Sequence, residues 1–588
     1  MSKFQDIIRR VVEPIIANFV HFFWYFLLLL VPSVVYWLQN PLDFIHIKYI
    51  ILSIPVCIWS AYLCTLILHV TRRQYIKLII YVILYFLASI ECFLLIFFGT
   101  WVNEMVIQLL LGTNLDETGG FIRMYVFTRD FLKYFLVVVI SFIVVVYSLR
   151  FSNKIKLIRD WLIFFIAFVV FSCMLINVWR DVRFVGLMGN GDPQLIASRR
   201  FSMSYSKNYT TLGRLFYAAR INFILAEDIQ NLEDTLSQER EVECEYRSSK
   251  IVLIIGESYN KHHSSLYGYC LNTNPLLGEE FENGNLFLYS DVITPFNATY
   301  RCLKSVFSFA SQDNNTYWTS DVLFPALFKD AGYCVKFISN QEVRGESEDT
   351  WNSFNNYLVN DRISKYLFDY TNKRKFQYDG DLIQDNLKII CDSPYQKAEL
   401  IIYHLMGQHV EYSERYPREY GVFKNSDYTH RADLDNASKS IVASYDNATY
   451  YNDKVVSDIL GFYKEEDVIL IYFSDHAEEV YDFRNRAGRC HDELIIPKRA
   501  KYEYQIPFMI WMSDKYMASH PAVVENIRNS LNYSFMIDDL PHLLIDIAGI
   551  DYEAFEPSRS VINPSYDKNR TRFLEVSKQN YEVIIGRE

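Results

Sequence analysis

Several patterns that would point to a function are missing from this chain of 588 residues. The formal net charge is −11 and no basic stripe with interleaved aromatic residues occurs, which argues against nucleic-acid binding. No internal repeat or low-complexity tract is evident. The ten cysteines are too widely spaced to predict any disulfide pairing. Beyond about residue 183, no apolar run is long enough to cross a bilayer.

Long apolar runs are present only in the first 180 or so residues. Each has close to the ~20 residues that a helix needs to cross a bilayer. The runs cover residues 19–38, 49–70, 78–98, 131–149 and 161–178, to within a few residues. They predict a membrane domain of five spans, followed by a large water-soluble domain. No small-residue cleavage site follows the first run, so we expect a retained helix and not a signal peptide.

Basic residues in the short loops predict the orientation of these spans. Lys and Arg collect at the N-terminus and after the second and fourth spans. The loops after the first and third spans carry few of them or mix them with acids. By the positive-inside rule, the N-terminus then lies inside the cell. Because the number of spans is odd, residues 183–588 then lie on the outer side of the membrane.

The water-soluble part alternates strand-like apolar runs with helical segments. The runs cover residues 251–255, 334–338, 400–403 and 468–473, and residues 538–550 resemble a closing helix. Such alternation predicts an α/β domain with a largely parallel sheet sandwiched by helices. We therefore expect three parts: a transmembrane domain (1–182), a helical connector (183–247) and an α/β domain (248–588).

Two of the predicted strands end in residues that bind metals. The run at 251–255 leads directly into Glu257, and the run at 468–473 leads into Asp475 and His476. Ligands of open α/β sheets bind at the carboxyl ends of the strands, so these three side chains should lie at one edge of the sheet. Carboxylate and imidazole groups suit a divalent metal.

A threonine lies between these two clusters in the sequence. Leu303, Val306, Phe307 and Ala310 follow Thr299 at helical spacing, so Thr299 should lie at the start of a helix. A helix N-terminus favours a phosphate, and a nearby metal would make the threonine hydroxyl a nucleophile. The alternative role for Thr299 is that of a helix cap. The nearby metal-type residues favour the nucleophile.

Three histidines also follow strand ends. His404 and His409 come just after the run at 400–403, and His491 follows Asp475 and His476 across a polar loop. Together they suggest a second metal or a phosphate-binding set.

An acidic residue, Glu91, lies within the third predicted span. An acid inside a membrane is costly, and a functional role is the usual expectation. The alternative is an interhelical hydrogen bond or a position near the outer interface, and the sequence does not favour a functional role over this alternative.

Together these residues resemble the phosphoethanolamine transferases of the bacterial inner membrane, within the alkaline phosphatase/sulfatase-like superfamily. The resemblance covers nearly the whole chain: five spans, a connector and the α/β domain. Its motifs are Gly256-Glu257-Ser258, Thr299 nine residues before Ser308, His404 with Gly407-Gln408-His409, and Ser474-Asp475-His476-Ala477-Glu478-Glu479.

The resemblance implies roles for individual residues. It implies a zinc ion that activates the nucleophile, bound by Glu257, Thr299, Asp475 and His476. It implies that a second zinc can be bound by His409 and His491. It also implies that the phosphoethanolamine group is contacted by His404, Asn340 and Glu478.

The resemblance also implies a reaction and a location. Thr299 would take phosphoethanolamine from phosphatidylethanolamine, release diacylglycerol into the bilayer, and pass the group to lipid A or to a core sugar of lipopolysaccharide. The protein would be a multi-pass protein of the bacterial inner membrane with its catalytic domain in the periplasm.

The chain departs from the family pattern at three places. Ala477 stands where glycine is usual, Gln408-His409-Val410-Glu411 replaces Asn-His-Gly-Pro, and the close cysteine pairs of many lipid A-modifying members are absent. The run from Asp475 to Asp482 is closer to the branch that modifies core sugars. The acceptor therefore stays open between lipid A and the core.

Other functions fit parts of the same pattern. A lipoteichoic acid synthase-like phosphoglycerol transferase would share the spans and the threonine but use Mn²⁺; the extra histidines favour phosphoethanolamine transfer and zinc. A non-catalytic membrane protein with a decayed enzyme domain would not be expected to retain all four residues of the first metal site. Sulfatase activity is not expected, because no Cys-x-Pro-x-Arg motif surrounds the nucleophile.

Overall fold

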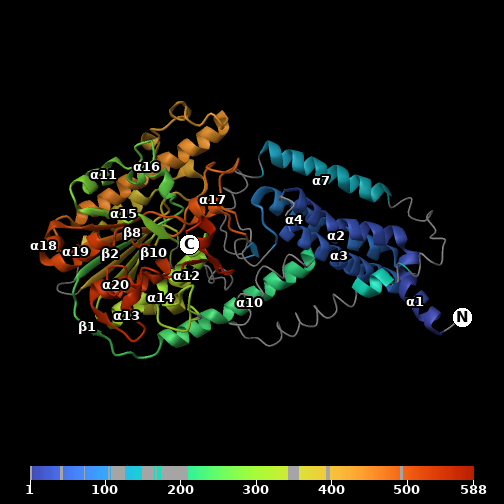
Figure 1. Cartoon of the computed structure of the whole chain (residues 1–588), viewed down its shortest axis with the longest axis horizontal. Helices are drawn as coiled ribbons and strands as arrows, with labels where there is room; N and C mark the ends of the chain where they lie inside the picture. Colours follow the sequence, from blue (N-terminus) through green and yellow to red (C-terminus); the bar gives the residue numbers. More distant parts are fainter. Residues whose placement is uncertain are drawn as a thin grey trace. The chain divides into compact units, whose positions relative to one another are not determined.

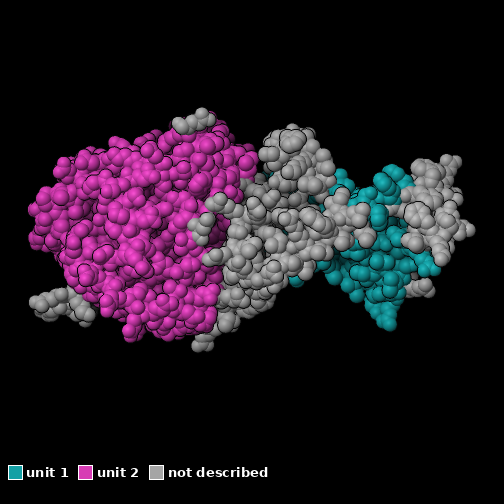
Figure 2. All heavy atoms as spheres, turned by 60° about the horizontal axis from the view of Figure 1, so that its bottom comes forward, with its two compact units in different colours: residues 1–225, 490–493 teal, residues 226–489, 494–588 magenta. Residues whose placement is uncertain are grey.

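The computed structural model describes residues 3–39, 44–71, 73–102, 106–107, 126, 128–148, 165, 168–173, 210–314, 316–341, 343, 357–391, 398–490 and 494–587. The chain forms two compact units, residues 1–225 with 490–493 and residues 226–489 with 494–588, which Figure 2 shows in separate colours. The boundary between them falls inside one long helix, α10 (Thr211–Leu236), in the segment predicted as a helical connector.

Among the described residues, the first unit contains four helices that are long and apolar enough to cross a membrane. These are α2 (Phe19–Gln39), α3 (Phe44–Thr71), α4 (Gln74–Phe98) and α7 (Arg129–Ser148), and α1 (Lys3–Ala17) precedes them (Figure 1). They confirm apolar helices at the positions of the first four predicted spans. Most of the fifth predicted span, at 161–178, lies outside the described residues. Its residues 168–173 are described and are helical, and the span itself remains a prediction.

The acid of the third predicted span, Glu91, forms a buried ion pair. Its carboxylate meets the guanidinium of Arg214, on the first turn of α10, with Nε 2.7 Å from Oε1. The Thr211 hydroxyl and the Val102 amide also donate to Glu91, and the Arg214 guanidinium lies 4.4 Å from the centre of the Trp101 ring. Of the two roles predicted for Glu91, the structure supports bonding between helices.

Glu91→Ala should strongly destabilise the first unit. Removing one partner of a buried ion pair leaves the other charge uncompensated, which costs about 3–5 kcal/mol. The double variant Glu91→Ala/Arg214→Ala should therefore be more stable than Glu91→Ala alone. Thermal unfolding of the full chain in detergent measures both. Asp130→Ala is the control, because Asp130 pairs with Lys133 at the surface of α7. Equal unfolding temperatures for Glu91→Ala and the unaltered protein would contradict this assignment.

The second unit is built on a sheet of seven strands in the order β3-β9-β8-β2-β7-β5-β6. The strands are β2 (Lys250–Gly256), β3 (Leu286–Leu288), β5 (Cys334–Ser339), β6 (Tyr370–Thr371), β7 (Glu399–His404), β8 (Ile469–Ser474) and β9 (Phe508–Met512). All pairings from β8 to β6 are parallel, whereas β9 runs antiparallel to β8 and to β3. The four predicted strands and the largely parallel sheet are confirmed.

Helices cover both faces of this sheet because successive apolar residues of its strands point to opposite sides. Ile251, Leu253 and Ile255 of β2 join one core with α12 (Thr299–Phe307), α13 (Phe324–Asp330), α14 (Asp361–Leu367) and α20 (Leu540–Ala548). Val252 and Ile254 join the other core with α11 (Pro275–Glu282), α15 (Asp379–Cys391) and α16 (Asn436–Tyr463) (Figure 1). The sandwich follows from this alternation.

Shorter elements complete the unit. The helices are α17 (Pro497–Arg499), α18 (Asp514–Ser519), α19 (Pro521–Ser530) and α21 (Tyr581–Ile585). Three two-stranded pairs join β1 (Glu243–Cys244) to β11 (Ile550–Asp551), β4 (Asp291–Ile293) to β10 (Ser534–Met536), and β12 (Phe573–Leu574) to β13 (Gln579–Asn580). The predicted closing helix is α20, which ends at Gly549 in the left-handed conformation.

The polar loops that follow β2 and β8 are linked by a buried histidine. His263 Nδ1 lies 2.6 Å from Asp446 Oδ1 on α16, and its Nε2 lies 3.3 Å from Asp482 Oδ1 in the loop after β8. Since carboxylates only accept hydrogen bonds, both ring nitrogens must donate, and the ring is an imidazolium. Burial alone would lower the pKa of His263, but the two carboxylates outweigh burial and raise it to about 10.

This imidazolium should make stability depend on pH. A pKa raised from 6.5 to about 10 gives stabilisation that is complete below pH 6.5 and is lost as the pH rises toward 10. The unaltered protein should have a larger free energy of unfolding than His263→Gln, and this difference should shrink by up to about 1.4 kcal/mol per pH unit across that window. Chemical denaturation at about pH 7 and about pH 9.5 measures it.

His262→Gln is the matched control for this experiment. Burial lowers the pKa of His262 to about 4, so its ring is neutral throughout the window and its effect should not change with pH. A difference between His263→Gln and the unaltered protein that stays constant over the same range would contradict the charged state of His263.

Candidate active site

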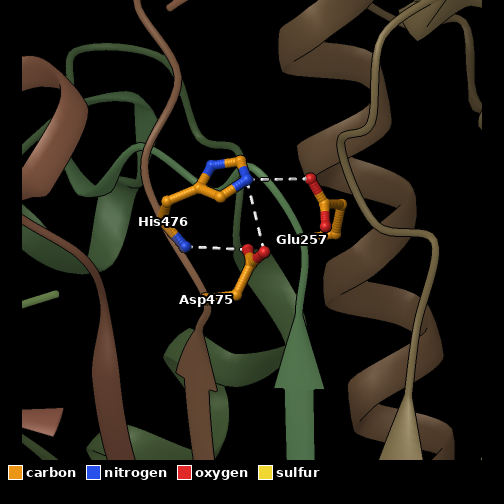
Figure 3. Close-up of side chains that lie close together, drawn as sticks. All are labelled: Glu257, Asp475 and His476. Atoms are coloured by element: carbon orange, nitrogen blue, oxygen red, sulfur yellow. Dashed lines mark hydrogen bonds and ion pairs between the residues drawn. The ribbon is translucent and has the colours of Figure 1, made fainter. Parts of the chain in front are cut away.

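Three of the predicted metal ligands lie together at the carboxyl edge of the sheet. Glu257 directly follows β2, and Asp475 and His476 directly follow β8. All three side chains are fully buried, and their ligand atoms lie within 4.8 Å of one another. Figure 3 shows His476 Nε2 pointing between the two carboxylates, 3.2 Å from Glu257 Oε1 and 3.2 Å from Asp475 Oδ2. Their predicted proximity is confirmed.

The register of the sheet causes this meeting. Gly256, the last residue of β2, pairs with Ser474, the last residue of β8, so the two chains leave the sheet side by side. The last residue of β7, His404, pairs with Ile255 of β2 and Ser339 of β5. The carboxyl ends of four strands are therefore level, and the residues after them share one edge.

Local hydrogen bonds fix the orientation of the cluster. Ser258 donates to Glu257 Oε1 at 2.7 Å, and the backbone amide of His476 donates to Asp475 Oδ1 at 2.7 Å. His476 Nδ1 lies 3.1 Å from the carbonyl of Ala477, which only accepts, so Nδ1 carries the proton. The Nε2 lone pair is then directed into the cluster, as in many metal-binding histidines.

The electrostatics of the cluster favour a cation. Burial and the neighbouring Glu257 raise the pKa of Asp475 well above its usual range, whereas His476 holds the pKa of Glu257 below its own despite burial. Asp475 Oδ2 is buried and accepts no hydrogen bond from the part of the chain that the structure describes. Two carboxylates and one imidazole, with one carboxylate oxygen left unsatisfied, fit a divalent metal such as zinc.

The Thr299 hydroxyl belongs to the same cluster. Thr299 is the first residue of α12, and its Oγ1 donates to Glu257 Oε2 at 3.1 Å and lies 3.2 Å from His476 Nε2. The N-cap position is occupied by Ala298, and no side chain caps the helix. The alternative of Thr299 as a helix cap is therefore wrong. Unlike the three buried residues, Thr299 is partly exposed, so a substrate can reach its hydroxyl.

Two glycines allow the backbone to approach closely here. A Cβ on Gly407 would lie 3.0 Å from both the nitrogen and the carbonyl oxygen of Glu257, and its φ of +48° is in the left-handed region. A Cβ on Gly256 would lie 2.2 Å from the hydroxyl of Tyr472. A larger residue at Gly407 would push against the backbone of Glu257, and one at Gly256 would push against the side chain of Tyr472.

The additional histidines are neutral and partly unsatisfied. His404 is buried at the end of β7, with Nδ1 3.2 Å from the Ser339 hydroxyl, and His409 lies in the following loop. His404 Nε2 and His409 Nδ1 have no hydrogen-bond partner among the described residues. Burial lowers the pKa of both to about 4, so each keeps a lone pair for a ligand. His491 lies outside the described residues.

The other two predicted contacts differ in their surroundings. Glu478 is buried, accepts from the Tyr412 hydroxyl at 3.0 Å, and pairs with Arg489 at 3.0 Å; burial raises the pKa of Glu478 to about 7. The Asn340 amide instead bonds to the Asp379 carboxylate at 2.8 Å and to the Phe376 backbone at 2.7 Å. Their roles toward substrate remain predictions.

Sequence reasoning missed two residues of this site. Gln341 donates to Glu257 Oε2 at 3.2 Å and to the Leu405 carbonyl at 2.7 Å. It follows the end of β5, so the strand-end pattern could have identified it. Arg489 donates to His476 Nε2 from a polar loop that has no periodicity, and no sequence signal marked it.

Comparison with known proteins gives three main likenesses. Phosphoethanolamine transferase EptC of Escherichia coli O18:K1:H7 is 32% identical over 334 residues, 55% of each chain, so this chain spans about half the length of the curated relatives it matches. The crystal structure of the C-terminal periplasmic domain of EptC from Escherichia coli in complex with Zn is 29% identical, with a TM-score of 0.50 over 57% of this chain and 92% of that one.

The third likeness concerns the fold alone. The integral membrane protein lipooligosaccharide phosphoethanolamine transferase A (EptA) of Neisseria meningitidis is 14% identical, with a TM-score of 0.57 over 91% of this chain and 97% of that one. It agrees with the combination of apolar N-terminal helices and a C-terminal α/β domain.

A match to residues of the second unit shows the family of this chain. A family model described as Sulfatase matches residues 249–550, just over half of the 588 residues. The match includes β2, α12, β8 and the whole buried cluster, and it confirms the expected alkaline phosphatase/sulfatase-like fold. This chain belongs to the sulfatase family.

Proposed function

We propose that this protein is a metal-dependent phosphoethanolamine transferase of the bacterial inner membrane. Its membrane domain, residues 1–182 with five spans, lies in the bilayer, and its catalytic domain, residues 248–588, lies in the periplasm. The donor is phosphatidylethanolamine, and the acceptor is lipid A or a core sugar of lipopolysaccharide. The 32% identity to EptC, which is named a phosphoethanolamine transferase, supports this substrate class.

One observation carries the proposal: the partly exposed Thr299 hydroxyl lies on the buried cluster, 3.1 Å from Glu257 and 3.2 Å from His476. A threonine hydroxyl is a poor nucleophile unless its pKa is lowered. The first turn of α12 directs backbone N–H groups to the same place, which suits the oxygens of a phosphoryl group.

The metal of the proposal is zinc, bound by Glu257, Asp475 and His476 together with Thr299. Bound there, it would lower the pKa of the hydroxyl and offset charge on the phosphoryl oxygens. The donor set and the EptC domain crystallised in complex with Zn support zinc. His409 and His491 are proposed for a second zinc.

The reaction has two half-reactions. The Thr299 hydroxyl donates its hydrogen bond to Glu257, which draws the proton from the attacking oxygen. Thr299 Oγ1 attacks phosphorus, the bond to the diacylglycerol oxygen breaks, that oxygen takes up the proton that Thr299 lost, and phosphoethanolamine stays on Thr299. An acceptor hydroxyl then attacks the same phosphorus, its proton passes to Oγ1, and Thr299 is freed. His404, Asn340 and Glu478 are the proposed contacts to the transferred group.

Thr299→Ala should abolish transfer and leave the fold intact. In hydrolases, loss of the nucleophile lowers the rate by roughly 10³-fold or more, and we expect a loss of that order here. Headgroup transfer from a fluorescent phosphatidylethanolamine measures the rate, and intact-protein mass spectrometry detects the adduct. Thr299→Ser keeps the hydroxyl and is the matched control. Continued transfer by Thr299→Ala would exclude the covalent scheme.

Removing the metal should stop transfer and lower stability together. A bound ion stabilises the folded protein by about 2.7 kcal/mol at a concentration of 100 times its Kd. Zinc should therefore raise the unfolding temperature of chelator-treated protein, and Asp475→Asn should reduce that rise. Asp453→Asn is the matched control, because Asp453 is buried on α16 and accepts from the backbone of α11. An unchanged response in Asp475→Asn would contradict the proposed ligand.

A further inference from the structure

An arginine, Arg489, touches the buried cluster. It lies in the polar loop after β8, and its Nη1 donates to His476 Nε2. The same Nη1 donates to the carbonyl of Asn297 at 2.8 Å, two residues before Thr299. Its Nε pairs with Glu478 Oε2 at 3.0 Å. The guanidinium and the Thr299 hydroxyl therefore meet at the same imidazole nitrogen.

The contact with His476 competes with a metal ion. The Nδ1 proton of His476 is used on Ala477, so Nε2 has the single lone pair through which the ring can bind a cation. One lone pair cannot accept from Arg489 and bind a metal at once. The arginine is also permanently charged, and a fixed positive charge at this distance opposes the arrival of a second cation.

Two anchors would keep Arg489 in the site after it leaves His476. Glu478 holds Nε, and the Asn297 carbonyl holds the guanidinium beside the start of α12. A guanidinium has five N–H donors in a planar fork that matches two phosphate oxygens. The N–H group released from His476 would then face the group that Thr299 carries.

We propose that Arg489 is a further substrate-binding residue of this site: it occupies His476 until a metal ion takes that nitrogen, and it then binds the oxygens of the phosphoryl group. The second step rests on the proposed function. The first step concerns only this chain and a divalent metal.

A zinc titration tests the first step. Zinc affinity of the full chain in detergent is measured by competition with a chelating dye, for the unaltered protein, Arg489→Gln and Arg484→Gln. We expect Arg489→Gln to bind zinc at least about tenfold more tightly, because both the competing hydrogen bond and the opposing charge are gone. Arg484 is the matched control, since it lies in the same loop but pairs with Glu503. Equal or weaker binding by Arg489→Gln would overturn the proposal.

A phosphate titration of the zinc-loaded protein tests the second step. Inorganic phosphate is the probe, and calorimetry is the measurement. Arg489→Gln should bind phosphate at least about tenfold more weakly, because a charged bidentate contact is lost. An unchanged affinity would overturn the role in substrate binding. If Arg489→Gln does not fold, Arg489→Lys should move both constants in the same directions by smaller factors.

These two titrations do not measure transfer. If they give the expected results while the unaltered protein transfers no headgroup, the proposed function fails and the assignment of Arg489 stands. If transfer depends on Thr299 but neither affinity changes in the variants, the proposed function stands and the assignment of Arg489 fails.

Discussion

The candidate active site depends on a repulsion that must be compensated: two carboxylates and an imidazole nitrogen are buried within 4.8 Å of one another. Glu257, Asp475 and His476 are all fully excluded from solvent, so water cannot offset their charge. The chain meets this constraint with hydrogen bonds to the carboxylates, with the guanidinium of Arg489, and with a donor geometry that suits a divalent cation. A nucleophile placed on such a cluster is already next to the charge that would activate it.

The sheet register made this part of the structure predictable. Parallel β2 and β8 end at paired residues, so a sequence pattern of apolar run followed by acid or histidine was enough to predict that Glu257 and Asp475 meet. The antiparallel β9 is also an apolar run, followed by Ser513 and Asp514, but it was not predicted; the three-residue β3 is too short to stand out in the sequence. The same holds for the membrane unit, where apolar length indicated the helices but not the partner of Glu91, because Arg214 is 123 residues away in the sequence.

The contacts that the sequence could not predict are made by side chains from irregular loops. Arg489 and Asp482 follow β8 in a stretch without periodicity, and their contacts depend on how that loop folds back over the sheet edge. His263 had no recognisable partner in the sequence, yet it is held between carboxylates of α16 and of this loop. The sequence favoured the nucleophile over the cap for Thr299; the position of Ala298 at the N-cap excludes the cap, and the role as nucleophile stays a prediction.

The loop after β8 contributes both negative and positive charge next to the cluster. Its buried acids, Glu478 and Glu479, add negative charge next to the cluster, and burial raises the pKa of each to about 7. Its arginines add positive charge: Arg484 pairs with Glu503, and Arg489 pairs with Glu478. Up to Arg489, the acids Glu478, Glu479 and Asp482 are equal in number to the arginines Arg484, Arg486 and Arg489, so this part of the loop adds little net charge to the edge of the sheet. The cluster at the strand ends is then the part of this edge where a further cation gains most.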